Sequence, residues 1–75
     1  MNFIVVSSNN CDWCRKAIKL LTDEGLDFQV ISVSDTPWLK TLMAQANLNK
    51  VPQVFRPDGQ LIGGYEALKV YLGRH

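Results

Sequence analysis

The stretch 8-SNNCDWCRKAIKLL-21 decides the fold, because it places two cysteines where a strand pattern gives way to a helix pattern. Before it, the run 2-NFIVVS-7 is apolar and rich in β-branched residues, which is typical of a strand buried on both faces. After Cys11, residues recur at the spacing of one helix face, namely Cys14, Ala17, Ile18 and Leu21. The sequence therefore predicts a strand that leads into a helix, with Cys11 at the junction.

The rest of the chain repeats the alternation of strand and helix patterns. Further strands are predicted over 27–34, 51–55 and 60–64, and a further helix over 65–72. The stretch 34–48 predicts another helix, which Asp35 or Thr36 can cap and whose first residue is Pro37. This order, β-α-β-α-β-β-α, predicts one α/β domain over residues 1–75 whose first two strands are parallel. In the second helix we expect Trp38 to pack in the core or at the helix end. The buried stripe of that helix is expected to be Leu39, Leu42, Met43 and Ala46.

The length and charge of the chain exclude several classes of function. The chain has 75 residues, a net charge of +1 and no basic run, so attraction to nucleic acid or to a membrane surface is not indicated. It has no apolar span of about 18 residues and no signal-peptide pattern. A disulfide between Cys11 and Cys14 closes too short a loop to stabilise the chain much. We expect a monomeric protein of the cytoplasm whose cysteines have a purpose other than crosslinking.

The position of Cys11 at the start of a helix favours nucleophilic chemistry. Free backbone amides and the helix dipole stabilise an anion there, so we expect the pKa of the Cys11 thiol to lie below its usual range. Asp12 opposes this shift through like charge, whereas Arg15 and Lys16 add positive charge. Cys14 lies one turn further along and is expected to be more buried. Cys11 would then attack an external disulfide, and Cys14 would resolve the mixed disulfide.

Two other interpretations of the cysteine pair have to be weighed. A structural zinc site needs two ligands beyond the pair, but the sequence has no third cysteine, and its one histidine is the last residue, His75. Two ordinary buried cysteines also fit the spacing, although a C-x-x-C pair beside a β-α-β pattern is typical of a redox motif. We therefore predict a redox pair and no metal site.

Three motifs together give the chain a family resemblance: 11-CDWC-14, 51-VPQVF-55 and 63-GGYEAL-68. With these motifs in this order, the chain resembles a glutaredoxin of the thioredoxin superfamily, and it is most similar to small dithiol glutaredoxins of the bacteriophage type. The resemblance covers nearly the whole chain. It implies a thioredoxin-like α/β fold, in which three helices flank a four-stranded mixed sheet of strand order 2-1-3-4.

The resemblance also implies a glutathione site beside the catalytic pair, Cys11 and Cys14. The peptide bond between Val51 and Pro52 is expected to be cis, and the backbone of Val51 would pair with the substrate cysteine as an added strand does. The implied glutathione-binding residues are Trp13, Val51, Pro52, Gly64, Tyr65 and Glu66. Of these, the glycine and the start of the last helix would hold the γ-glutamyl end. From the residues alone, Pro52 also fits an edge strand, and Glu66 also fits a residue that matches the helix dipole.

The chain departs from the family pattern at several positions near this site. Asp12 stands where proline is usual, Ser8 where a lysine is common, and Lys50 where threonine is frequent. A lysine at the position of Ser8 would pair with the glycine carboxylate of glutathione, so its absence weakens that contact. Lys40 and Lys50 are the candidates to replace it.

The predicted function is that of a glutathione-dependent dithiol–disulfide oxidoreductase, which reduces protein disulfides and glutathione mixed disulfides. The resemblance implies glutathione as co-substrate, glutathione reductase as an indirect partner, ribonucleotide reductase as a candidate client and no tightly bound cofactor. One alternative is a glutaredoxin-like carrier reduced by thioredoxin reductase. Another is an iron–sulfur cluster carrier, in which two chains each offer Cys11 and two glutathione molecules complete the ligand set. If the source is viral, the cytoplasm is that of the host.

Overall fold

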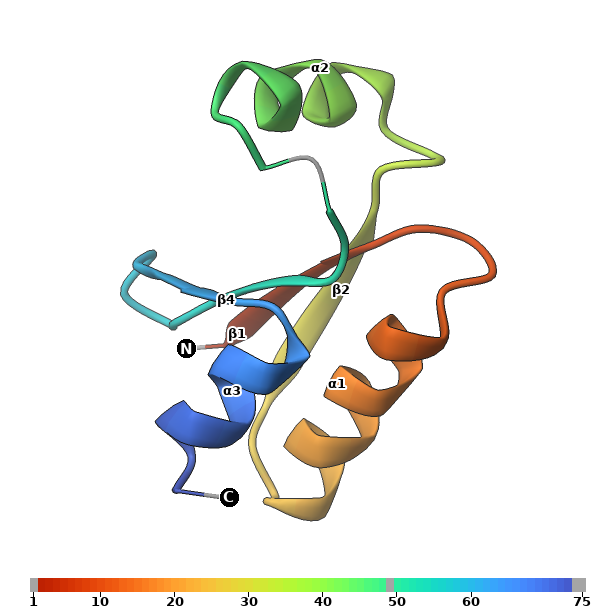
Figure 1. The fold of residues 1–75 in the computed structure, drawn as a ribbon. Helices are drawn as coiled ribbons and strands as arrows, with labels where there is room; N and C mark the ends of the chain where they lie inside the picture. The colour runs from red at the N-terminus through yellow and green to blue at the C-terminus, as the bar shows by residue number, and fades with distance from the viewer. Residues whose placement is uncertain (1, 49, 74–75) are drawn as a thin grey trace.

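The computed structural model describes residues 2–48 and 50–73, and Figure 1 shows how their helices and strands are arranged. Within these residues the chain forms four strands and three helices in the predicted order. The elements are β1 (Phe3–Ser7), α1 (Asp12–Asp23), β2 (Phe28–Ser32), α2 (Pro37–Gln45), β3 (Gln53–Phe55), β4 (Leu61–Gly63) and α3 (Tyr65–Tyr71). None of these helices is long and apolar enough to cross a membrane.

The strands form one mixed sheet of order β2-β1-β3-β4. β1 pairs in parallel with β2, so that Val5 lies opposite Val30. β3 pairs antiparallel with both β1 and β4, and Val54 lies opposite Val5 across the central pair. Because parallel neighbours need a crossover connection, α1 links β1 to β2 across one face of the sheet. The predicted strand order and the thioredoxin-like fold class are confirmed.

The hydrophobic core lies between the sheet and two of the helices. Figure 1 shows α1 and α3 together on one side of the sheet and α2 on the other side. Side chains alternate along a strand, so β1 directs Phe3 and Val5 toward α1 and α3. The buried core cluster consists of Phe3, Val5, Ala17, Leu21, Val54 and Leu68. This packing holds β1 and α1, the two elements that meet at Cys11.

The face of the sheet under α2 is packed more thinly than predicted. Of the expected stripe in this helix, only Met43 is buried, while Leu42 is 52% exposed and Ala46 is exposed. The expectation that Trp38 packs in the core or at the helix end is also wrong, because its side chain is 68% exposed. Leu39 is half-buried, so of the nine residues of α2 only Met43 is buried, and the helical spacing overestimates the buried face.

Candidate active site at the two cysteines

Cys11 and Cys14 form a disulfide at the start of α1, and their Cα atoms are 5.2 Å apart. Cys11 caps the helix: its backbone is extended, and its Sγ accepts a hydrogen bond of 3.1 Å from the backbone N–H of Cys14. Cys14 is 2% exposed, whereas Cys11 is half-buried. The more accessible sulfur is therefore the one at the helix terminus, which is the arrangement needed for attack by Cys11 and resolution by Cys14.

The charged side chains next to the pair offset one another. Arg15 and Asp12 form an ion pair, and their side chains are 63% and 86% exposed. The positive charge that Arg15 was expected to add near Cys11 is therefore neutralised by the carboxylate of Asp12. The helix terminus itself stabilises a negative charge on the Cys11 sulfur, through the N–H of Cys14.

The segment around Val51 lies beside the accessible sulfur. The peptide bond between Val51 and Pro52 is cis, as the resemblance implies. The carbonyl oxygen of Val51 lies 3.9 Å from Cys11 Sγ, and Pro52 is buried while Val51 is half-buried. The backbone groups of Val51 are therefore placed where an extended substrate can pair with them as its sulfur meets Cys11.

A cavity of about 500 Å³ opens beside this segment, between the start of α1 and the start of α3. Its lining includes every residue predicted to bind glutathione: Trp13, Val51, Pro52, Gly64, Tyr65 and Glu66. The rings of Trp13 and Tyr65 lie 5.7 Å apart between their centres and form an aromatic side of the cavity. The fold thus brings together residues from three motifs that are far apart in the sequence.

Two cations lie at the edge of this cavity: Lys16, which was expected to add positive charge near Cys11, and Lys69, which the sequence prediction left out. Lys16 Nζ lies 4.3 Å from the centre of a Trp13 ring, and Lys69 Nζ lies 5.5 Å from the centre of the Tyr65 ring. A signal for both pairs is present in the sequence, because residues three or four apart on a helix are neighbours. Lys69 Nζ also lies 3.7 Å from the carboxylate of Glu66. The aromatic side therefore has two lysines at its outer edge, one of which is paired with Glu66.

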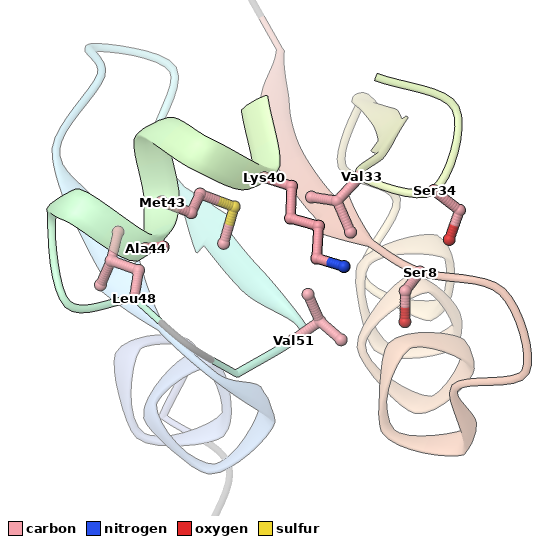
Figure 2. A pocket seen from close by; sticks show the side chains of 8 residues that line it. All are labelled: Ser8, Val33, Ser34, Lys40, Met43, Ala44, Leu48 and Val51. Carbon is pink, nitrogen blue, oxygen red and sulfur yellow. The ribbon is translucent and has the colours of Figure 1, made fainter. Parts of the chain in front are cut away.

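Ser8, the position where the family lysine is missing, lines a second cavity of about 310 Å³. Figure 2 shows the Lys40 side chain reaching from α2 into this cavity, with its amino group toward Ser8 and Val51. Lys50, the other candidate, lines the first cavity instead. The ammonium group of Lys40 therefore lies near the position that the family lysine would occupy, a placement that no local sequence pattern indicates.

The metal-binding alternatives can be compared with the described residues. Within residues 2–48 and 50–73, no group of three or more His, Cys, Asp or Glu side chains is placed to hold a metal ion. His75 lies outside the described residues. Because an iron–sulfur cluster needs several thiolate ligands, a cluster at Cys11 would draw ligands from other molecules.

Comparisons with known proteins agree with this geometry. A family model described as Glutaredoxin matches residues 3–62. Among curated proteins, the chain is 34% identical over 67 residues to the hybrid peroxiredoxin hyPrx5 of Haemophilus influenzae. That match covers 89% of this chain but 27% of the relative, so the chain spans about a quarter of the length of the curated relative it matches.

Solved structures are similar over nearly the whole chain. The dithiolic glutaredoxin of Trypanosoma brucei brucei is 29% identical, with a TM-score of 0.83 over 96% of this chain and 77% of that one. Buckwheat glutaredoxin, solved as a complex with glutathione, is 28% identical, with a TM-score of 0.78 over 96% and 70%. The NrdH-redoxin of Escherichia coli, at 19% identity and a TM-score of 0.81 over 96% and 93%, shows the shared fold alone. With the family model matching most of its length and a cysteine pair at the start of α1, this chain belongs to the glutaredoxin family.

Proposed function

We propose that the protein is a dithiol–disulfide oxidoreductase that reduces protein disulfides and glutathione mixed disulfides. The observation that carries the proposal is the position of the Cys11 sulfur at a helix terminus, 3.9 Å from the Val51 carbonyl and beside the cavity that Val51 lines. A substrate that pairs with Val51 presents its disulfide to Cys11. Cys14 is buried one turn along α1, out of reach of the solvent but next to Cys11.

The reaction follows from the two sulfur positions. The Cys11 thiolate attacks one sulfur of the substrate disulfide, and the other sulfur leaves as a thiolate that takes a proton from solvent. The Cys14 thiolate, formed by loss of its proton, then attacks Cys11 Sγ. This step releases the second substrate sulfur and forms the disulfide between Cys11 and Cys14. The substrate gains two electrons and the cysteine pair loses two, and two molecules of glutathione then restore the dithiol.

The first cavity offers groups that suit glutathione. Backbone amides of Gly64 and the start of α3 suit its γ-glutamyl carboxylate, and the carboxylate of Glu66 suits its ammonium group. Glu66 already lies near Lys69, but its side chain is 75% exposed and has free oxygen lone pairs for a second cation. On the other side of Val51, the ammonium group of Lys40 suits the glycine carboxylate. The solved complex of buckwheat glutaredoxin with glutathione supports the same ligand.

A second candidate function is that of a carrier reduced by thioredoxin reductase. Ser8 favours it, because this residue lacks the charge with which the family lysine would hold glutathione. The match to a hybrid peroxiredoxin suggests a peroxiredoxin as one client, and ribonucleotide reductase is another candidate from the family resemblance. In either function we expect a cytoplasmic monomer. An iron–sulfur carrier would instead be a brown dimer after anaerobic purification.

The deciding experiment is NADPH-coupled reduction of a glutathione mixed disulfide. One arm contains glutathione and glutathione reductase, the other contains thioredoxin reductase, and the Cys11→Ser variant serves as the blank in both. We expect turnover in the glutathione arm only. Turnover only with thioredoxin reductase would assign the protein to the carrier class, and no turnover in either arm would reject an oxidoreductase of this type.

A further inference from the structure

The two cavities meet beside the reactive sulfur. The second cavity shares Val51 with the first, and among the residues that the structure describes the two linings have no other member in common. The Val51 carbonyl lies 3.9 Å from Cys11 Sγ. A substrate chain that pairs with Val51 therefore extends from its cysteine toward the first cavity in one direction and toward the second cavity in the other.

The lining of the second cavity combines apolar side chains with one cation. Its apolar residues come from the loop after β2, from α2 and from the segment that follows α2: Val33, Met43, Ala44 and Leu48. Figure 2 shows Lys40 directing its amino group into the space between these residues and Val51. In the described part of the chain, no carboxylate forms an ion pair with Lys40. A hollow of this kind suits a group with an apolar body and a carboxylate nearby.

Glutathione leaves most of this space empty. In the proposed binding mode, its γ-glutamyl end lies at Gly64 and Glu66, so the residue that follows its cysteine lies on the side of Lys40. That residue is glycine, which has no side chain to fill a cavity of about 310 Å³. A protein client has a side chain at the same place. Apolar lining that glutathione does not use therefore points to a role in selecting protein clients.

We propose that the second cavity binds the client residue directly after the reacting cysteine and favours a large apolar side chain there, followed by an acidic residue that reaches Lys40. This inference rests on the proposed function and names its class of protein substrate. Attack by the Cys11 thiolate forms a disulfide with the client cysteine and releases the other client sulfur as a thiolate. The apolar side chain of the client enters the second cavity as this disulfide bond forms. Its burial therefore raises the rate at which Cys11 attacks the client disulfide.

The test uses the Cys14→Ser variant, in which the mixed disulfide at Cys11 accumulates. It is mixed with symmetric disulfides of short peptides that contain Cys-Leu-Glu, Cys-Gly-Glu, Cys-Leu-Gln or the reversed order Glu-Leu-Cys, and with glutathione disulfide. The second-order rate of mixed disulfide formation is measured by mass spectrometry. Each rate is divided by that of a small thiolate with the same peptide, which removes differences in intrinsic reactivity. We expect Cys-Leu-Glu to react about tenfold faster than Cys-Gly-Glu and about threefold faster than Cys-Leu-Gln.

Two variants in the same background locate the effect, each with a matched control. Ala44→Phe fills the cavity from an exposed position on α2 and should abolish most of the preference for leucine, while Gln45→Phe, on the same helix but outside the lining, should keep it. Lys40→Gln should abolish the preference for glutamate, while Lys19→Gln, on α1 and paired with Asp23, should keep it.

Each outcome decides between the two proposals. Equal rates for Cys-Leu-Glu and Cys-Gly-Glu, a rate for the reversed Glu-Leu-Cys equal to that for Cys-Leu-Glu, or an unchanged preference in Ala44→Phe would overturn the client pocket. In these cases reaction with glutathione disulfide would leave the oxidoreductase function standing. Failure to react with any disulfide, glutathione disulfide included, would overturn both.

Discussion

Replacing Gly63 with alanine should destabilise the protein, while the same change at Gly64 should not. The φ angle of Gly63 is +126°, a conformation that residues with a side chain rarely adopt, and a Cβ there would lie 3.0 Å from the Cβ of Ala67 in α3. Backbone strain of this kind costs about 1–3 kcal/mol, and the lower entropy of the unfolded alanine variant returns about 0.4–1 kcal/mol. With the close contact added, we expect a loss of about 2 kcal/mol.

Gly64 is the matched control for this strain. Its φ angle is −82°, which any residue adopts, and a Cβ there would lie 3.6 Å from the carbonyl oxygen of Pro52, an ordinary contact distance. Gly64→Ala should therefore leave the free energy of unfolding within about 0.5 kcal/mol of the unchanged protein, or raise it slightly. Because Gly64 lines the first cavity, the added methyl group should instead raise the KM for glutathione mixed disulfides.

Thermal unfolding followed by circular dichroism checks the pair. For a chain of 75 residues, a loss of about 2 kcal/mol corresponds to a fall in Tm of about 8–16 °C. We expect that fall for Gly63→Ala and a change of a few degrees at most for Gly64→Ala. Equal Tm values for the two variants, or the larger fall in Gly64→Ala, would refute the reasoning from φ and from the contact with Ala67.

The remaining predictions concern the cysteines, the core and the glutathione site. In the coupled assay, Cys11→Ser should abolish disulfide exchange. Cys14→Ser should still reduce glutathione mixed disulfides, because glutathione itself can resolve the intermediate at Cys11, but it should lose most reduction of protein disulfides. The opposite pattern would exchange the roles of the two cysteines. Leu21→Ala, at a side chain that is 0% exposed, should lower the free energy of unfolding by about 2–5 kcal/mol. Trp38→Ala, at a side chain 68% exposed, should change the free energy of unfolding by less than about 0.5 kcal/mol. Urea unfolding that shows the larger loss for Trp38→Ala than for Leu21→Ala would contradict the assigned core. Glu66→Gln should raise the KM for glutathione mixed disulfides about threefold with kcat unchanged, because an exposed ion pair contributes about 0.2–1 kcal/mol. An unchanged KM would exclude Glu66 from the glutathione site.

The helix that carries the cysteines can be predicted from the sequence, because several independent signals agree there. The apolar strand pattern ends before Cys11, polar turn residues follow, and the helical spacing then begins. In the structure α1 starts at Asp12 with Cys11 as its cap, and Cys14, Ala17 and Leu21 are buried as the spacing predicts. Long elements with consistent local signals are specified by short-range interactions, so the pattern of neighbouring residues is enough to predict this helix.

The packing of α2 cannot be predicted in the same way. Helical spacing shows which residues share a face, but it does not show how much of that face another element covers. Leu42 has the spacing of a core residue and is nevertheless 52% exposed, so the contact that buries Met43 does not cover it. The extent of that contact depends on where the connections on both sides of α2 place the helix, which is a property of the whole chain.

The residues around the candidate active site can be predicted in part from the sequence. The family resemblance, rather than any spacing, groups Trp13, Val51 and Tyr65 into one site, and the structure places them around one cavity. Lys40 faces Ser8 only because the connection from β2 to β3 carries α2 over the end of β1. A lysine that approaches Ser8 from another element leaves no trace in a local motif.

The Cys11 sulfur lies between the well-packed side of the sheet, with α1 and α3, and the less packed side, with α2. This position suits the disulfide exchange that we propose. Exchange requires three sulfurs to align, so the protein's own sulfurs must keep their positions in every turnover. Cys14 and Pro52 are both buried, and the core cluster lies on the side of the sheet with α1 and α3. Clients differ in shape, however, and the half with α2 has a thin packing that leaves a cavity open to them. Val51 lines both cavities, so under the proposed function a substrate that pairs with its backbone would meet both the cavity beside α3 and the cavity beside α2.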